Sequence, residues 1–73
     1  MTLQEAVGLR IRTLRKAKGF SQEDFADHCG IHRTYMGSME RGEKNVSLEI
    51  LAKVAKGLKL SLSELLKDVE TTK

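Results

Sequence analysis

The 73-residue sequence contains no proline, no tryptophan, a single cysteine and no long run of apolar residues. Because no proline interrupts a helix, and 40% of the residues are apolar and 32% charged, the composition is typical of a compact, helix-rich soluble protein. Cys29 has no second cysteine with which to form an internal disulfide. No apolar stretch approaches the roughly 20 residues of a membrane span, or the core of a signal peptide. We therefore expect a protein of the reducing cytoplasm without a membrane partner.

The length of the chain is enough for a single domain, over residues 1–73. No internal repeat, low-complexity tract or linker divides it. A domain of this size buries only about 60% of its unfolded surface and is marginally stable alone. Small domains without disulfides or metals often gain stability by association, so we expect a homodimer.

The net charge of +3 permits a polyanionic partner but does not require one. The distribution of charge is more informative, because the basic residues cluster in two places. The first cluster, in the first helical pattern, consists of Arg10, Arg12, Arg15, Lys16 and Lys18. It is either a solvated helix face or a surface that contacts phosphates. The second cluster consists of Arg33, Arg41 and Lys44.

Capping residues and apolar periodicity divide the chain into five short helices without a strand, which is an all-α fold. The first helix begins after Thr2 and stops at Gly19, and the second ends at Gly30. The third spans residues 33–40 and ends before Gly42. The expected capping residues are Thr2 with Glu5, Ser21 with Asp24, Ser47, and Ser61 with Glu64.

Apolar residues at helical spacing are expected to face a common core. In the first helix these are Leu3, Val7, Ile11 and Leu14. In the fourth and fifth helices they are Leu48, Leu51, Ala52, Ala55 and Leu58, and then Leu62, Leu65, Leu66 and Val69. Residues 70–73 are polar and are expected to fray.

Residues 22–41 have the pattern of two helices joined by a tight turn. Gly30 stands at the turn, where glycine adopts a positive φ at little steric cost. Ala26 is small enough to let the two helices cross closely. The apolar residues expected to hold this pair together are Phe25, Cys29, Ile31, Met36 and Met39. The second helix of the pair would then project a polar outer face from Arg33 to Ser38.

This outer face carries residue types that read bases in the major groove of DNA. An α-helix fits that groove, and the residues at the start of such a helix contact base edges. The expected base-reading residues are Arg33, Thr34 and Ser38. The planar guanidinium of Arg33 can bond O6 and N7 of guanine together, whereas Thr34 offers its hydroxyl to several bases or its methyl group to thymine.

Polar residues around the third helix are suited to contacts with the DNA backbone. They are Ser21, Gln22, His32, Tyr35, Arg41, Lys44 and Asn45. Gln22 lies in the first turn of the second helix, whose partial positive charge favours a phosphate. His32 either caps the third helix or touches a phosphate, and Tyr35 either bonds a phosphate or covers the core beside Met36. The residues from Arg41 onward either follow the backbone or are merely solvated.

Other chemistries have little support in the sequence. His28, Cys29 and His32 are near one another, but the turn at Gly30 separates them, Cys29 is needed in the core and no fourth ligand is nearby. We therefore expect no metal, no cofactor and no small-molecule ligand. No nucleophile stands beside a base, no glycine-rich phosphate loop occurs, and so small a domain has little room for a pocket, so we expect no enzyme.

Residues 9–66 resemble the Cro/repressor-type helix-turn-helix family of bacterial and phage transcription regulators. The motifs that carry the resemblance are LRKAKGFSQEDFA at 14–26, GIHRTYMGSMERGEKN at 30–45 and LEILAKVAKGLKLSLSELL at 48–66. The resemblance implies a lambda-repressor-like DNA-binding domain. In it, Gln22 takes the phosphate-clamping position, Glu40 and Arg41 match the end of the third helix, and the base-reading positions fall on Arg33, Thr34 and Ser38.

The phrases HRTY and ERGEKN are similar to those of controller proteins of restriction-modification systems, and they also occur in phage-type repressors and in antitoxins. The controller likeness implies a homodimer on a palindromic operator, formed largely by the helices within residues 47–69, with Leu62 and Leu66 in the interface. The alternative is that these leucines complete the core of a monomer. Lys44 stands where controllers often carry arginine. Lys59 replaces a common helix-ending glycine, which predicts either a lysine with a positive φ or a reshaped turn there.

Two classes of function therefore remain open. The first is a regulator that reads duplex DNA, and a two-fold dimer of that kind would set its reading helices about 34 Å apart. The second is a protein-interaction module that uses the same pair of helices to dock a protein, for which the modest charge of +3 leaves room. A steep dependence of duplex affinity on salt distinguishes the first class from the second.

Overall fold

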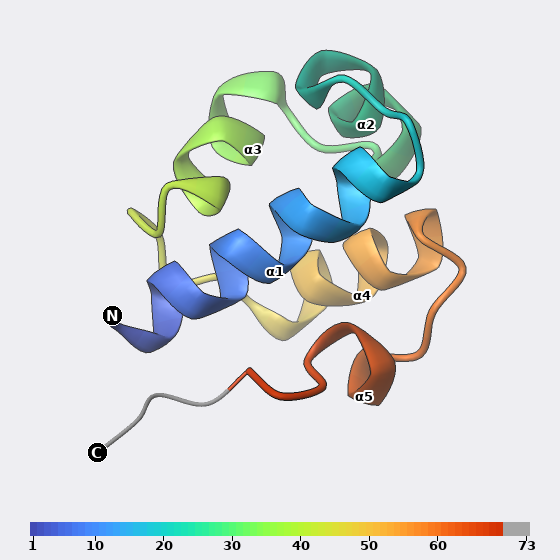
Figure 1. Cartoon of the computed structure of the whole chain (residues 1–73). Coiled ribbons are helices and arrows are strands. Elements are labelled where there is room, and N and C mark those ends of the chain that lie inside the picture. Colours follow the sequence, from blue (N-terminus) through green and yellow to red (C-terminus); the bar gives the residue numbers. More distant parts are fainter. Residues whose placement is uncertain (70–73) are drawn as a thin grey trace.

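Five helices make up the fold in the computed structural model, which describes residues 1–69. They are α1 (Leu3–Ala17), α2 (Gln22–Cys29), α3 (Arg33–Glu40), α4 (Leu48–Gly57) and α5 (Leu62–Leu65). The all-α prediction is confirmed, since residues 1–69 contain no strand. Figure 1 shows α1 across the middle of the molecule, with α2 and α3 on one side of it and α5 on the opposite side. The prediction for residues 70–73 lies outside the described residues.

Each helix begins at a residue whose side chain accepts a backbone N–H of the first turn. Thr2 and Ser61 do so within complete capping boxes, as predicted, and Ser21 and Ser47 cap α2 and α4. In the box of α1, the carboxylate of Glu5 accepts the N–H of Thr2 at 2.7 Å. This hydrogen bond, made to the charged form, lowers the pKa of Glu5. The N-termini of these helices are therefore determined by side chains within three residues of each start.

The end of α5 differs from the expected one. The helix ends at Leu65 and does not continue to Val69, because the N–H groups of Lys67 and Val69 bond three residues back, to the carbonyls of Glu64 at 3.3 Å and Leu66 at 3.0 Å. Asp68 then has a positive φ of 63°. At the end of α4, Lys59 has a φ of 59°, so of the two expected alternatives the lysine with a positive φ is the one observed.

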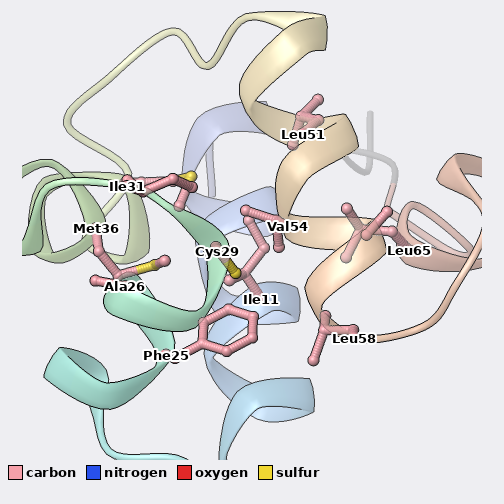
Figure 2. Packing of buried hydrophobic residues seen from close by; sticks show 12 residues of the cluster. Ile11, Phe25, Ala26, Cys29, Ile31, Met36, Leu51, Val54, Leu58 and Leu65 are labelled. Carbon is pink, nitrogen blue, oxygen red and sulfur yellow. The ribbon is translucent and has the colours of Figure 1, made fainter.

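A single apolar cluster joins all five helices (Figure 2). It is made of Ile11, Phe25, Ala26, Cys29, Ile31, Met36, Met39, Leu51, Val54, Ala55, Leu58 and Leu65. All the residues expected to hold α2 and α3 together are part of it. Burial raises the pKa of the Cys29 thiol to about 11, so the thiol stays protonated near neutral pH.

Four residues expected in the core are exposed, among them Leu62 at 37%. Leu48 is 72% exposed and Leu3 is 54% exposed, and Ala52 is exposed as well. In α4 the inward stripe is instead Leu51, Val54, Ala55 and Leu58, which has the spacing i, i+3, i+4 and i+7. Leu48 lies in the first turn of α4, beyond this cluster, so periodicity alone misplaced it. In residues 1–69, no helix is both long and apolar enough to span a bilayer.

Candidate nucleic-acid interface

The turn between α2 and α3 places the two helices as the sequence predicts. Gly30 has a φ of 71°, and the N–H of Ile31 bonds to the carbonyl of Ala26 at 2.9 Å, which closes the end of α2. Ala26 is fully buried between the helices. The start of α3 therefore projects from the body of the protein, while its second half packs into it.

The first turn of α3 carries two of the three predicted base-reading residues in exposed positions. Arg33 and Thr34 are exposed at its N-terminus. The expectation that Ser38 shares this outer face is wrong, because Ser38 is only 9% exposed and its hydroxyl donates to the carbonyl of Thr34 at 3.1 Å. Five consecutive residues, 36–40, are buried, so the second half of α3 is enclosed on all sides.

His32 and Tyr35 each had two possible roles in the sequence. His32 is the N-cap of α3, and its Nδ1 accepts the N–H of Thr34 at 3.2 Å. In the neutral ring the proton then lies on Nε2, which is a donor suited to a phosphate oxygen. Tyr35 is half-buried and packs against the core cluster. His32 thus caps the helix and Tyr35 covers the core, as one of the two alternatives for each residue predicted. Neither arrangement prevents a contact with DNA.

A buried ionic cluster connects the start of α2 to the end of α3. The carboxylate of Glu40 accepts hydrogen bonds from Nε and Nη2 of Arg15, at 2.7 and 2.9 Å. It accepts a third from Nε2 of Gln22, at 3.1 Å. The side chains of Arg15 and Glu40 are only 8% and 3% exposed. Arg15 also donates to the carbonyl of Phe20 at 2.9 Å. This cluster fixes the amide of Gln22, because a carboxylate only accepts and so Nε2 must face Glu40.

The first basic cluster does not form a continuous basic face. Arg15 lies in the buried ionic cluster, so neither alternative expected for it, solvation or a phosphate contact, is correct. Arg10 donates to the carbonyls of Leu65 and Glu64, at 3.0 and 2.9 Å, and so ties α1 to α5. Arg12, Lys16 and Lys18 remain exposed. Local patterns in the sequence do not indicate these contacts, because their partners lie 25 to 55 residues away along the chain.

The loop after α3 carries the remaining predicted backbone contacts at its surface. Arg41, Lys44 and Asn45 are all exposed. Arg41 donates to both carboxylate oxygens of Glu43, at 2.9 and 3.2 Å. This pair lowers the pKa of Glu43 and raises that of Arg41. Oδ1 of Asn45 accepts a hydrogen bond from Nε2 of Gln4, which connects the loop to α1.

Comparison with known proteins agrees with this geometry. A family model described as "Helix-turn-helix" matches residues 11–65, and the chain belongs to this family. It is 42% identical to control protein C.SmaI of Serratia marcescens over 66 residues, which cover 90% of this chain and 79% of that protein.

Solved structures extend the similarity to the whole fold. The crystal structure of the restriction-modification controller protein C.AhdI from Aeromonas hydrophila matches 85% of this chain and 94% of that one, with 45% identity and a TM-score of 0.82. The biofilm master regulator SinR, in a complex with DNA, covers 84% of this chain and 98% of its own, with 37% identity and a TM-score of 0.78. The predicted likeness to controller proteins is therefore confirmed.

Proposed function

We propose that this protein is a sequence-specific DNA-binding transcription regulator that controls a restriction-modification operon as a homodimer on a palindromic operator. The observation that carries the proposal is the exposed first turn of α3, where Arg33 and Thr34 stand on a rigid bihelical unit. The controller proteins among its relatives and the DNA complex of SinR support it. This role needs no catalytic group, metal, cofactor or small-molecule ligand, and its place is the reducing cytoplasm, where a single buried thiol is stable.

In this mechanism α3 enters the major groove with its N-terminal end. Arg33 and Thr34 read base edges, without the enclosed Ser38. Phosphates bind on two sides of this turn. On one side Ser21 and Gln22 stand at the positive end of α2, and on the other the loop offers Arg41, Lys44 and Asn45. His32 and Tyr35 lie beside the reading turn and complete the backbone contacts.

Replacing Arg33 with alanine is expected to weaken binding to the operator by about 1 to 3 kcal/mol and to relax selectivity at one base pair. The reason is that a guanidinium can bond O6 and N7 of guanine together, which no other base permits. Fluorescence anisotropy with operator and random duplexes measures both effects. The matched control is Arg41→Ala, which removes the same side chain from the loop and should weaken both duplexes alike. If Arg33→Ala and the parent bind both duplexes with equal affinities, Arg33 does not contact the bases.

The proposed dimer uses α4 and α5, which lie away from the reading turn (Figure 1). Leu62 on α5 is 37% exposed, as an interface residue must be in a single protomer. Leu66 is partly buried, packs against the core and lines an apolar groove of about 410 Å³ with Leu3 and Val7. Two protomers related by a two-fold axis through this region would bind half-sites about 34 Å apart.

Replacing Leu62 with lysine is expected to shift the protein from dimer to monomer, because the substitution places a charge in an apolar interface. Sedimentation velocity measures the change, and operator affinity should fall at least about tenfold because the two half-sites are no longer linked. The control is Leu9→Lys, which makes the same change at an exposed leucine of α1. A Leu62→Lys protein that sediments as the parent does would exclude Leu62 from the interface.

Selection from a randomised duplex library tests the function as a whole. Near physiological salt, the bound fraction should be enriched in an inverted repeat with half-sites about one helical turn apart. No enrichment, together with an affinity that hardly changes with salt, would instead support a protein-interaction module. Phage-type repressors and antitoxins share this mode of reading, so an endonuclease gene beside the recovered operator is the result expected for a controller.

A further inference from the structure

An acidic residue contacts the proposed reading arginine within the surface that would face DNA. Nη1 of Arg33 donates to Oε2 of Glu23, which lies in the first turn of α2. Both side chains are well exposed, 65% for Arg33 and 62% for Glu23. An exposed ion pair of this kind contributes little to folding stability. A carboxylate there also repels phosphates, so it opposes DNA binding unless it serves the reading of the sequence.

The atoms of the contact leave the useful edge of the guanidinium available. A guanidinium bonds guanine with two parallel N–H groups, and one such pair is formed by Nε and Nη2. Glu23 takes Nη1, which lies at the other side of the group. The contact therefore orients the arginine and leaves its Nε and Nη2 edge free to bond O6 and N7 of guanine.

The helical turn that carries Glu23 is held by contacts of the two residues before it. Its neighbour Gln22 is held by the buried carboxylate of Glu40 at 3.1 Å, and Ser21 caps the same turn through the N–H of Asp24 at 3.0 Å. The first turn of α2 is thereby fixed to the end of α3. Glu23 can thus hold Arg33 at a constant place relative to the reading helix.

We propose that Glu23 is a specificity-determining residue that positions Arg33 for guanine and keeps it from phosphates, an inference that rests on the proposed DNA-reading function. Arginine is long and flexible, and a free guanidinium binds phosphates of any sequence as readily as it binds a base. The ion pair restricts it to the geometry that reads one base. Glu23 therefore trades affinity for selectivity.

The test is Glu23→Gln, which keeps the shape of the side chain and removes its charge. Affinity for a random duplex is expected to rise about threefold, with a salt slope steeper by about one because Arg33 gains a phosphate. The ratio of operator affinity to random-duplex affinity is expected to fall about tenfold. Fluorescence anisotropy at several salt concentrations provides all three quantities, and circular dichroism verifies the fold.

The matched control is Glu43→Gln, which makes the same change of charge beside Arg41, outside the reading turn. It should raise the affinity for the operator and for the random duplex by the same factor, so the ratio of the two affinities stays unchanged. If Glu23→Gln behaves in the same way while the parent protein is selective, Glu23 acts only through its charge and the inference is overturned. A parent protein without any preference for the selected duplex overturns the regulator function itself, so the two failures are distinguishable.

Discussion

Replacing Glu40 with alanine is expected to lower the free energy of unfolding by about 3 to 5 kcal/mol. Glu40 accepts two hydrogen bonds from Arg15 and one from Gln22. Without it, the buried guanidinium of Arg15 keeps the carbonyl of Phe20 as its partner and has no opposite charge. Urea denaturation followed by circular dichroism measures the loss as a lower midpoint at an unchanged slope.

An exposed glutamate provides the control for this prediction. Glu43→Ala breaks the pair with Arg41, whose side chain is 59% exposed, and should leave the denaturation midpoint almost unchanged because water screens the two charges. Replacing both buried partners, with Arg15→Met and Glu40→Leu, should recover most of the loss, because no buried charge then remains unpaired. Equal midpoints for Glu40→Ala and Glu43→Ala would show that the buried ionic cluster does not contribute to the free energy of unfolding.

Replacing Gly8 with alanine is expected to destabilise the fold by about 3 kcal/mol or more. A Cβ atom at this position of α1 would lie 2.4 Å from the carbonyl oxygen of Met39 and 2.6 Å from that of Glu40. Both oxygens belong to the backbone of α3, so they move only if the two helices separate. In an exposed helix the same substitution would stabilise by about 1 kcal/mol, so the sign is reversed here. Thermal and urea denaturation measure the effect.

Gly37→Ala is the control for the clash at Gly8. A Cβ atom on Gly37 would meet only the ends of two side chains, Nη1 of Arg41 at 3.1 Å and Oε1 of Gln22 at 3.3 Å. The exposed end of Arg41 can rotate away, and the amide of Gln22, which Glu40 holds, needs to shift only slightly, so the loss of stability should be much smaller than for Gly8. Similar losses for the two variants would contradict a specific contact between the backbones of α1 and α3.

The helices, the turn and most of the core follow from local signals. Capping pairs such as Ser61 with Glu64 act within three residues, and Gly30 needs only its own φ to end α2. The predicted bounds of α3, residues 33–40, are those observed. Local signals also indicated that Arg33 and Thr34 are exposed, because exposure of a helix start depends mainly on the adjacent turn.

Errors arose where a residue's surroundings depend on another helix. Periodicity assigned Leu48 to the core, but its helix begins beyond the cluster it was expected to join. Ser38 is polar and one turn from Thr34, yet α3 is enclosed over its whole second half. In both cases the residue type and spacing were interpreted correctly. Burial depends on which residues of other helices lie nearby, and the sequence does not show this.

By itself, the sequence determined the all-α class, the five helix starts, the α2–α3 turn and the family to which the chain belongs. Only the tertiary structure decided the pairings of Arg15 with Glu40 and of Arg33 with Glu23, and the approach of α3 to Gly8. The physical reason is range. Capping bonds and turn conformations act between neighbours in the chain, whereas ion pairs and backbone contacts between helices exist only after packing brings distant residues together.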